Sequence, residues 1–252
     1  MSFKTLVLTA AFCVVSGPVT GAEEEGQPPR HVRFLPVGDA PPFRQEIRDG
    51  VRYELDAPPG SIPPREVVPG FGGGLALRLG RLSAAAEVPA GMAAMVLRSK
   101  DAAEDAVAWL KLAALPESGD FLVVVWRSSD AKSWNAPRSL IVPDGPLGHP
   151  AGMVRITNLF PAGIRIMWGD EAILVPAGRT FLRKVDPGAG VPLKILVADK
   201  SGGMKRYYSG TVTQNRGERG FITIYQADGV APRRPLKVSM LREPVPGTAA
   251  GG

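Results

Sequence analysis

Side chains that commonly perform catalysis are scarce in this chain of 252 residues. It contains one cysteine and two histidines, and it has no HExxH, CxxC, GxSxG, P-loop or GxGxxG pattern. His31 follows the letters QPPR and His149 lies in LGHPAG, so we expect both in solvent-exposed loops. A catalytic triad or a metal site needs an imidazole that is held by packed neighbours. The sequence therefore predicts no catalytic residues, no metal site and no cofactor.

Acidic side chains leave one catalytic alternative open. Two carboxylates that face each other across a cleft are sufficient for glycoside hydrolysis. The candidates for such a pair are Glu87, Asp120, Asp170, Glu171, Asp199 and Glu218. Most of them lie in turns beside Gly or Pro, where carboxylates ordinarily cap the backbone or face water. We therefore expect a non-enzymatic protein and keep a carbohydrate-active hydrolase as the alternative.

Aromatic and basic side chains favour a binding function. Lys205 and Arg206 precede Tyr207 and Tyr208 in MKRYYSG, and Trp134 lies in the polar stretch DAKSWNAP. An exposed aromatic ring beside cations can stack on a sugar or bind an acidic polymer. The residues predicted to form a binding surface are Trp134, Lys205, Arg206, Tyr208, Arg216 and Arg219. The remaining tryptophans of strand-like segments are expected in the core: Trp109, Trp126 and Trp168.

The charges are unevenly distributed along the chain. Residues 23–150 contain 14 basic and 17 acidic side chains, a net charge of −3, whereas residues 151–252 contain 15 basic and 7 acidic, a net charge of +8. A field of positive sign attracts anionic partners. We expect an anionic polymer of the cell envelope or another envelope protein, and no nucleic acid because no nucleic-acid-binding motif is present. The opposite signs also permit head-to-tail self-association.

The first 22 residues have the order of a signal peptide. Lys4 precedes the apolar run TLVLTAAFCVV, which ends at Ser16 before a predicted cleavage after Ala22. The run is shorter than the roughly 20 residues of a membrane-spanning helix. Cys13 lies within it, so the mature chain would have no cysteine. The sequence predicts a periplasmic or secreted protein with no integral membrane segment.

The remaining segments are almost entirely strand-like. The clearest are GIRIMWG, AILVPAG, TFLRKV, PLKILVAD, MKRYYSGTVT, GFITIYQ and PLKVSML. They are short, often alternate apolar with polar residues, and are separated by Gly, Pro, Asp or Asn. Such spacing predicts antiparallel β-sandwiches. Residues 101–115 fit either a helix or a strand, and we favour a helical turn over residues 101–105 that leads into a strand.

The letters VPAG occur twice, at residues 88–91 and 175–178, among motifs that recur in a similar order. HVRFLP matches MVRITNLFP, DFLVVVW matches GFITIYQ, APRSLIV matches APRRPLKV, and WLKLAAL matches PLKILVA. We predict a tandem duplication in which VPAG is the same hairpin in both copies. The predicted boundaries are a polar leader at 23–31, a first sandwich domain at 32–143 with a Pro/Gly-rich insertion at 37–74, a linker at 144–152, a second sandwich domain at 153–242 and a disordered tail at 243–252.

The stretch VRITNLFPAGIRIMWGDEAILVPAGRTFLRKV resembles exported bacterial proteins of unknown function that carry tandem immunoglobulin-like or transthyretin-like domains. These often open with a VRxxN strand and have a PAG turn before the next strand; VRFLP in the first half lacks the asparagine found at Asn158. The resemblance implies two immunoglobulin-like sandwiches and no catalytic residues. The sequence thus predicts an exported, non-enzymatic binding or assembly protein of the cell envelope.

Overall fold

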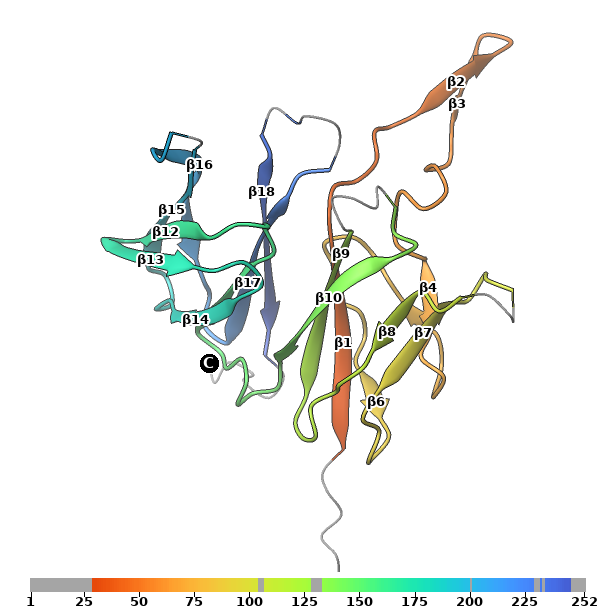
Figure 1. Ribbon diagram of the computed structural model, residues 1–252, viewed down its shortest axis with the longest axis horizontal. Coiled ribbons are helices and arrows are strands. Elements are labelled where there is room, and N and C mark those ends of the chain that lie inside the picture. Colours follow the sequence, from red (N-terminus) through yellow and green to blue (C-terminus); the bar gives the residue numbers. More distant parts are fainter. Residues whose placement is uncertain are drawn as a thin grey trace, which may run out of the picture.

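The computed structural model describes residues 29–103, 107–127, 133–199, 201–228, 232 and 234–245. These residues form 18 strands and no helix, which confirms the predicted all-β sandwich fold (Figure 1). No helix in these ranges is long and apolar enough to cross a membrane. The predicted signal peptide lies outside the described residues.

The N-terminal half contains the first ten strands. They are β1 (Arg30–Val37), β2 (Gln45–Arg48), β3 (Val51–Glu54), β4 (Glu66–Val68), β5 (Leu75–Ala76), β6 (Ala86–Val88), β7 (Met95–Ser99), β8 (Leu110–Leu112), β9 (Phe121–Arg127) and β10 (Pro137–Pro143). Two sheets, with strand orders β10-β9-β1-β6 and β5-β4-β7-β8, enclose an apolar core that includes Phe34, Leu97 and Phe121. Strands β2 and β3 form a separate hairpin.

The C-terminal half contains the other eight strands. They are β11 (Met153–Asn158), β12 (Ile164–Trp168), β13 (Glu171–Val175), β14 (Thr180–Lys184), β15 (Gly190–Ala198), β16 (Met204–Thr213), β17 (Glu218–Gln226) and β18 (Leu236–Pro244). Their sheets have the orders β14-β11-β17-β18 and β13-β12-β15-β16, and a second core lies between them. Strand alternation builds this core: Ile164, Ile166 and Trp168 are buried, while Arg165 between them is exposed.

The two halves have the same strand order. Taken along the chain, β1 and β4 to β10 occupy the positions of β11 to β18, and the β2–β3 hairpin has no counterpart. In each half the first strand pairs in parallel with the strand equivalent to β9, through β1–β9 and β11–β17. The matches of HVRFLP, DFLVVVW and APRSLIV with their second-half partners follow this order.

The prediction that the two VPAG turns are equivalent is wrong. The first follows β6, whereas the second follows β13, whose position in the sheet order is that of β5. WLKLAAL, which contains β8, likewise corresponds in position to β16 and not to the β15 segment PLKILVA. Pro followed by Gly makes a compact reversal between many pairs of strands, so a shared turn motif does not fix topology.

Several predicted boundaries also change. Arg30 and His31, assigned to the leader, belong to β1, and β18 reaches Pro244, inside the predicted disordered tail. Residues 246–252 lie outside the described ranges. The predicted insertion at 37–74 contains β4, whose Val67 is fully buried in the core. Short strands flanked by Pro and Gly are difficult to recognise in sequence.

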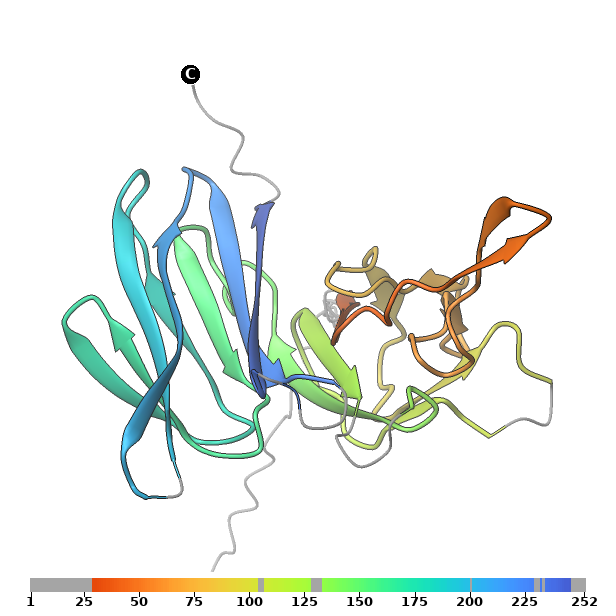
Figure 2. The same cartoon turned by 90° about the horizontal axis from the view of Figure 1, so that it is seen from above.

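The halves meet along an apolar junction. Leu35, Leu122 and Val124 point away from the N-terminal core and pack with Phe221 and Tyr225 of the C-terminal half. Figure 2 shows the two halves side by side, with β10 and β18 between them. Strand β9 is therefore buried on both faces, which explains its continuous apolar run FLVVV in place of an alternating pattern.

Candidate binding surface

Two residues of the predicted binding surface are buried, so these predictions are wrong. Trp134 is 1% exposed and belongs to the N-terminal core. The indole of Trp109, which is itself buried as predicted, donates a hydrogen bond to the Trp134 carbonyl at 2.5 Å. The polar residues around Trp134 in the sequence suggested that its ring is exposed. The ring instead packs in the N-terminal core, where the short strands leave volume that a loop side chain can fill. Trp168 is buried and Trp126 is partly buried, in line with their predicted core positions.

Arg219, also predicted to bind a ligand, belongs to a closed ring of four charges at the junction. Arg33 donates to Asp144 Oδ2 and to both oxygens of Glu243, at 2.7 Å each. Arg219 Nε donates to Glu243 Oε1 at 2.7 Å, and its Nη2 lies 3.3 Å from Asp144 Oδ1. Burial disfavours the charged form of Glu243, but the two guanidinium groups outweigh it and lower its pKa. All four charges are neutralised within the protein.

The segment predicted as a linker is held firmly by the same region. Arg155 donates to the carbonyls of Pro143 and Gly148, and Arg219 donates to the carbonyl of His149. His149 is fully buried, and its ring packs edge-on against Phe221 with centroids 4.6 Å apart. Burial, together with the nearby Arg155 and Arg219, lowers the pKa of His149 to about 3. The expectation of an exposed loop histidine is wrong here, because two arginines order the loop around it.

A second polar contact joins the halves at the other end of the junction. Tyr225 donates to Asp39 Oδ1 at 3.1 Å, and Lys237 lies 2.8 Å from the other oxygen of Asp39. Arg127 forms an ion pair with Asp228 at 2.8 Å. Burial next to Asp39 raises the pKa of the Tyr225 phenol. The junction therefore combines an apolar centre with ion pairs at both ends.

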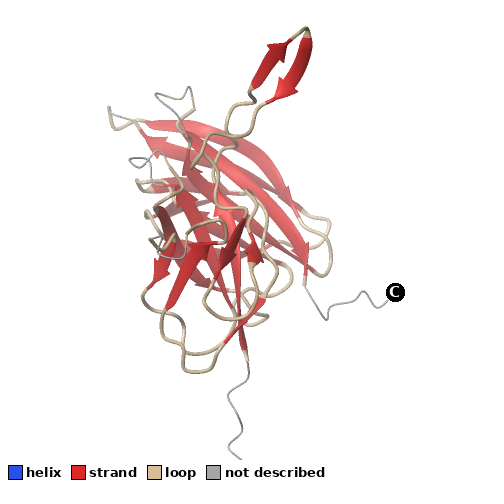
Figure 3. Cartoon of the chain, turned by 90° about the vertical axis from the view of Figure 1, so that its right-hand side faces the viewer, coloured by secondary structure: helices blue, strands red, loops and turns tan. Residues whose placement is uncertain are grey.

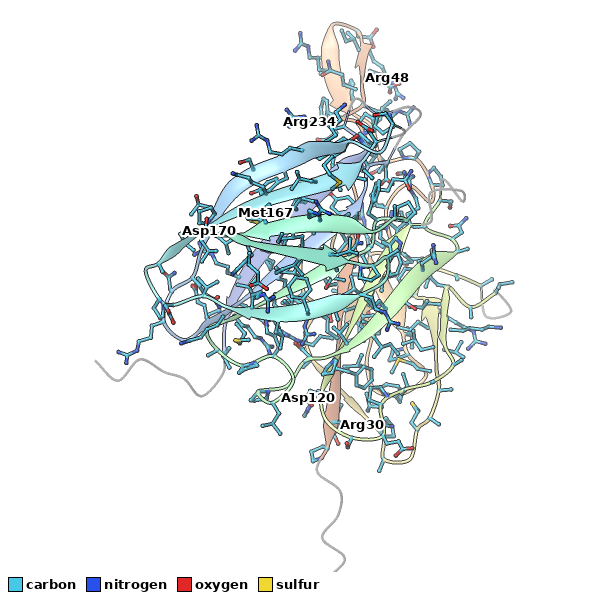
Figure 4. The ribbon with its side chains drawn as sticks, turned by 60° about the vertical axis from the view of Figure 1, so that its left-hand side comes forward. Arg30, Arg48, Asp120, Met167, Asp170 and Arg234 are labelled. Atoms are coloured by element: carbon cyan, nitrogen blue, oxygen red, sulfur yellow. The ribbon has the colours of Figure 1, made fainter. Side chains whose placement is uncertain are left out.

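The six candidate carboxylates are placed mostly beside local partners. Asp199 accepts hydrogen bonds within its own turn, Glu218 accepts from Asn215, and Glu171 accepts from Arg183. Asp170 is exposed in the turn between β12 and β13, as labelled in Figure 4. The sheet β10-β9-β1-β6 brings the last two candidates, Glu87 and Asp120, to either side of β1.

Glu87 and Asp120 lie on either side of His31. Glu87 on β6 is the cross-strand partner of His31, and His31 Nδ1 lies 3.1 Å from Asp120 Oδ1. Adjacent strands are separated by about 4.8 Å, so the Cα atoms of the two acidic residues are roughly 10 Å apart. His31 and Asp120 also line a cavity of about 330 Å³ between the halves, together with Arg33, Asp144 and Arg219. His31 is thus a partly exposed strand residue and not a loop residue.

The outer side of sheet β13-β12-β15-β16 is an exposed surface that carries cations. The core-facing residues of this sheet are known from burial, and the strand register then assigns the outward ones. We call this surface the cationic face. Its outward residues are Ala172, Leu174, Arg165, Met167, Gly190, Pro192, Lys194, Leu196, Ala198, Met204, Arg206, Ser209, Thr211 and Thr213. Figure 4 looks onto this face, with Met167 labelled on it.

Three cations and no carboxylate point outward from the cationic face. Arg165, Lys194 and Arg206 are all exposed, and none has an ion-pair partner among the described residues. Arg165 and Arg206 flank Leu196 on adjacent strands, and Lys194 lies two residues along β15. Strand spacing and rise place the three Cα atoms about 8–10 Å apart. Apolar side chains lie beside them, including Leu174, which pairs with Arg165 on the edge strand β13 and is 71% exposed.

Of the predicted binding residues, only Arg206 lies on the cationic face. Lys205 is exposed but points to the opposite side, where its Nζ lies 5.4 Å from the ring centre of Tyr207. Tyr208 faces the core side, and its hydroxyl lies 3.8 Å from the sulfur of Met240. Arg216 is exposed in the turn between β16 and β17, beyond the other end of β16. A β-bulge between Ile195 and Leu196 sets this alternation.

Sequence alternation alone indicated part of the cationic face. IRIMW and PLKILVA place Arg165 and Lys194 opposite the buried residues of their own strands. Their proximity depends on the pairing of β12 with β15, which the chain order does not reveal. No protein-family model matches this chain, and no curated protein matches it in sequence. Among the described residues, no group of three or more His, Cys, Asp or Glu side chains is placed to hold a metal ion.

Proposed function

We propose that this protein is an exported, non-enzymatic binding or assembly protein of the cell envelope that binds an anionic polymer through the cationic face. The observation that carries the proposal is the outward grouping of Arg165, Lys194 and Arg206 without any carboxylate. The shared strand order of the halves supports two tandem sandwich domains. In this arrangement the C-terminal domain presents the polymer-binding face.

Electrostatics explains why an anionic ligand fits. Three like charges on neighbouring strands repel one another, and a polyanion that follows the sheet relieves this repulsion. The neighbouring apolar side chains of this face, Met167, Leu174 and Leu196, can pack against the uncharged backbone of the polymer. Exposed ion pairs contribute up to about 1 kcal/mol each, so one contact set gives weak binding. Affinity should therefore rise with polymer length and fall with salt.

Binding to dextran sulfate, with neutral dextran as the uncharged control, tests the proposal. Replacing the three cations together, Arg165→Gln, Lys194→Gln and Arg206→Gln, should weaken dextran sulfate binding at least about tenfold at low salt. The matched control is the triple variant Arg179→Gln, Arg216→Gln and Arg234→Gln. It removes the same net charge from exposed positions outside the cationic face. This control should lower affinity by less than about threefold.

Equal losses in the two triple variants would show that only net charge matters, and the cationic face would be rejected. Absence of binding by the wild-type protein to any sulfated, phosphorylated or carboxylated polymer would reject the proposed ligand class. Mass spectrometry of the N-terminus of protein recovered from the native envelope tests export, because cleavage after Ala22 would leave Glu23 as the first residue.

One observation favours a second candidate function, the carbohydrate-active hydrolase. Glu87 and Asp120 flank His31 with Cα atoms roughly 10 Å apart, and Asp120 also lines a cavity, so two carboxylates of the kind that glycosidases use lie near one another. Hydrolysis of a polysaccharide that is lost in both Glu87→Gln and Asp120→Asn would establish it. Activity that persists in either variant would reject this pair.

A further inference from the structure

The β2–β3 hairpin projects from the N-terminal half as an arm (Figure 3). Every residue of β3 is exposed, and so are three of the four residues of β2. Four large apolar side chains are uncovered on the arm: Phe43 is 70% exposed, Ile47 63%, Val51 52% and Tyr53 47%. An isolated two-stranded hairpin is marginally stable in water, and clustered exposed apolar side chains mark interaction sites. A hairpin with these properties would be stabilised by a partner that covers its apolar side chains.

The strand register divides the arm into two faces. Glu46 pairs with Tyr53 and Arg48 with Val51, so these four side chains share one face, which we call the closed face. On the closed face Arg48 forms an ion pair with Glu46, and its guanidinium lies 5.9 Å from the ring centre of Tyr53. The polar groups of this face therefore satisfy one another within a single copy.

The other face, which we call the open face, has no such internal pairing. Gln45 pairs with Glu54 and Ile47 with Arg52, and the alternation continues to Phe43 through the hydrogen bond from the Leu55 amide to the Arg44 carbonyl. Arg52 and Glu54 have no ion-pair partner among the described residues. The open face therefore carries one cation, one anion and two of the most exposed apolar side chains.

We propose that the open face docks onto the open face of a second copy of this chain. Its charges are complementary to themselves, since a two-fold axis that crosses the strands at the level of Tyr53 places Arg52 over Glu54 of the partner subunit and the reverse. The same operation places Ile47 of each copy over Gln45 of the other, and Phe43 over the turn at residues 49–50 of the other copy. A partner of strong single charge would leave either Arg52 or Glu54 opposed by a like charge.

The small area of the open face limits the expected affinity of the dimer. A standard stable interface buries about 800 Å² on each partner, and one face of two four-residue strands provides much less. We therefore expect a weak dimer that is populated at about 100 µM protein and above. This inference does not depend on the proposed function, because the arm and the cationic face lie on different halves of the molecule.

Sedimentation velocity from about 10 µM to 1 mM protein tests the dimer, and the dissociation constant is the quantity measured. Ile47→Asp should raise it at least about tenfold, whereas Val51→Asp on the closed face should leave it within about twofold. Arg52→Glu and Glu54→Arg should each raise it about tenfold because like charges then meet. The double variant Arg52→Glu/Glu54→Arg should return it to within about threefold of wild type.

The rescue by the double variant distinguishes the proposed contact from a general loss of solubility or folding. Thermal unfolding of each variant should match wild type, because the arm lies outside both cores. A protein that is monomeric up to 1 mM would overturn the proposal. So would a dimer that is insensitive to Ile47→Asp or one in which the double charge exchange fails to restore association. Dextran sulfate binding should be unchanged in all these variants, so failure here leaves the polymer proposal untouched.

Discussion

The two halves of the molecule have the same strand order but differ in the lengths of their strands. In the C-terminal half every strand has at least five residues, and regular alternation fills the core. In the N-terminal half β4, β5, β6 and β8 have only two or three residues. Its core is completed by side chains from loops, among them Leu77, Leu115 and Trp134. A sandwich topology therefore tolerates very short strands when loop side chains replace the lost apolar volume.

The same difference separates the proposed interaction surfaces. Long strands in the C-terminal half form an uninterrupted sheet, which displays the cationic face. The corresponding N-terminal sheet is interrupted by loops, and its half instead carries the inserted β2–β3 arm. Long, regular strands provide a broad flat face, whereas short strands joined by loops leave room for an inserted hairpin. If strand length also sets stability, the N-terminal half should unfold more easily than the C-terminal half.

Trp134→Ala should have the largest effect, because it removes the loop residue that completes the N-terminal core. We expect a loss of about 3–5 kcal/mol in the free energy of unfolding. Urea denaturation with hydrogen exchange should place the loss in the N-terminal half first, while amides of β12 and β15 remain protected. Asn135→Ala, an exposed neighbour, should change stability by less than about 0.5 kcal/mol. Equal loss of protection in both cores would show that they do not differ as proposed.

Arg219→Ala should have the next largest effect, because it leaves the buried Asp144 and the partly buried Glu243 without one of the two guanidinium groups of the ring. Removing one partner of a buried charge network costs about 3 kcal/mol. The loss should weaken the junction and separate the unfolding of the halves into two calorimetric transitions. Arg216→Ala, an exposed neighbour, is the control. One unchanged transition in Arg219→Ala would contradict a stabilising role for the ring.

The pH dependence of stability should report the buried His149 of the junction. Its folded pKa of about 3 lies below the ordinary value of 6.5, so the unfolded chain binds the proton first as the pH falls. This group therefore lowers the free energy of unfolding by up to about 1.4 kcal/mol per pH unit below about pH 6.5. His149→Gln should remove that contribution. Denaturation between pH 6.5 and 5 measures it, and identical slopes in the two proteins would refute the assignment.

The two VPAG turns should show the smallest effects and similar ones. Gly91 and Gly178 have φ values of 73° and 71°, and a Cβ added to either would meet no heavy atom within 4 Å. Alanine at each position should cost about 1 kcal/mol, because the cost comes from the left-handed backbone. Gly163→Ala, where φ is not positive and the nearest contact is ordinary, is the control. The free energy of unfolding is measured by urea denaturation. A difference of more than about 1 kcal/mol between Gly91→Ala and Gly178→Ala would show that tertiary context, and not the turn itself, sets the cost.

Local pattern predicted the fold class and the strands of the C-terminal half well. Each of the strands β12 to β18 overlaps a segment that alternation and turn residues had identified, although β13, β15, β17 and β18 extend beyond their segments. The ambiguous residues 101–115 contain the strand β8, while residues 104 and 105 of the expected helical turn lie outside the described ranges. The candidate site was predicted poorly. Arg206 was identified, but Trp134 and Arg219 were misplaced because polar neighbours in sequence do not reveal what packs over a side chain.

The sequence by itself determined which residues alternate and where the chain turns, because these depend on contacts between near neighbours. It therefore determined the all-β class and the outward position of Arg165 and Lys194 within their own strands. Only the tertiary structure decided which strands are adjacent. That decision brings Arg165 and Arg206 to one face and closes Arg33 and Glu243 into a ring across 210 residues. The physical reason is that sheet pairing and burial are long-range, so equal local motifs such as VPAG can occupy different places.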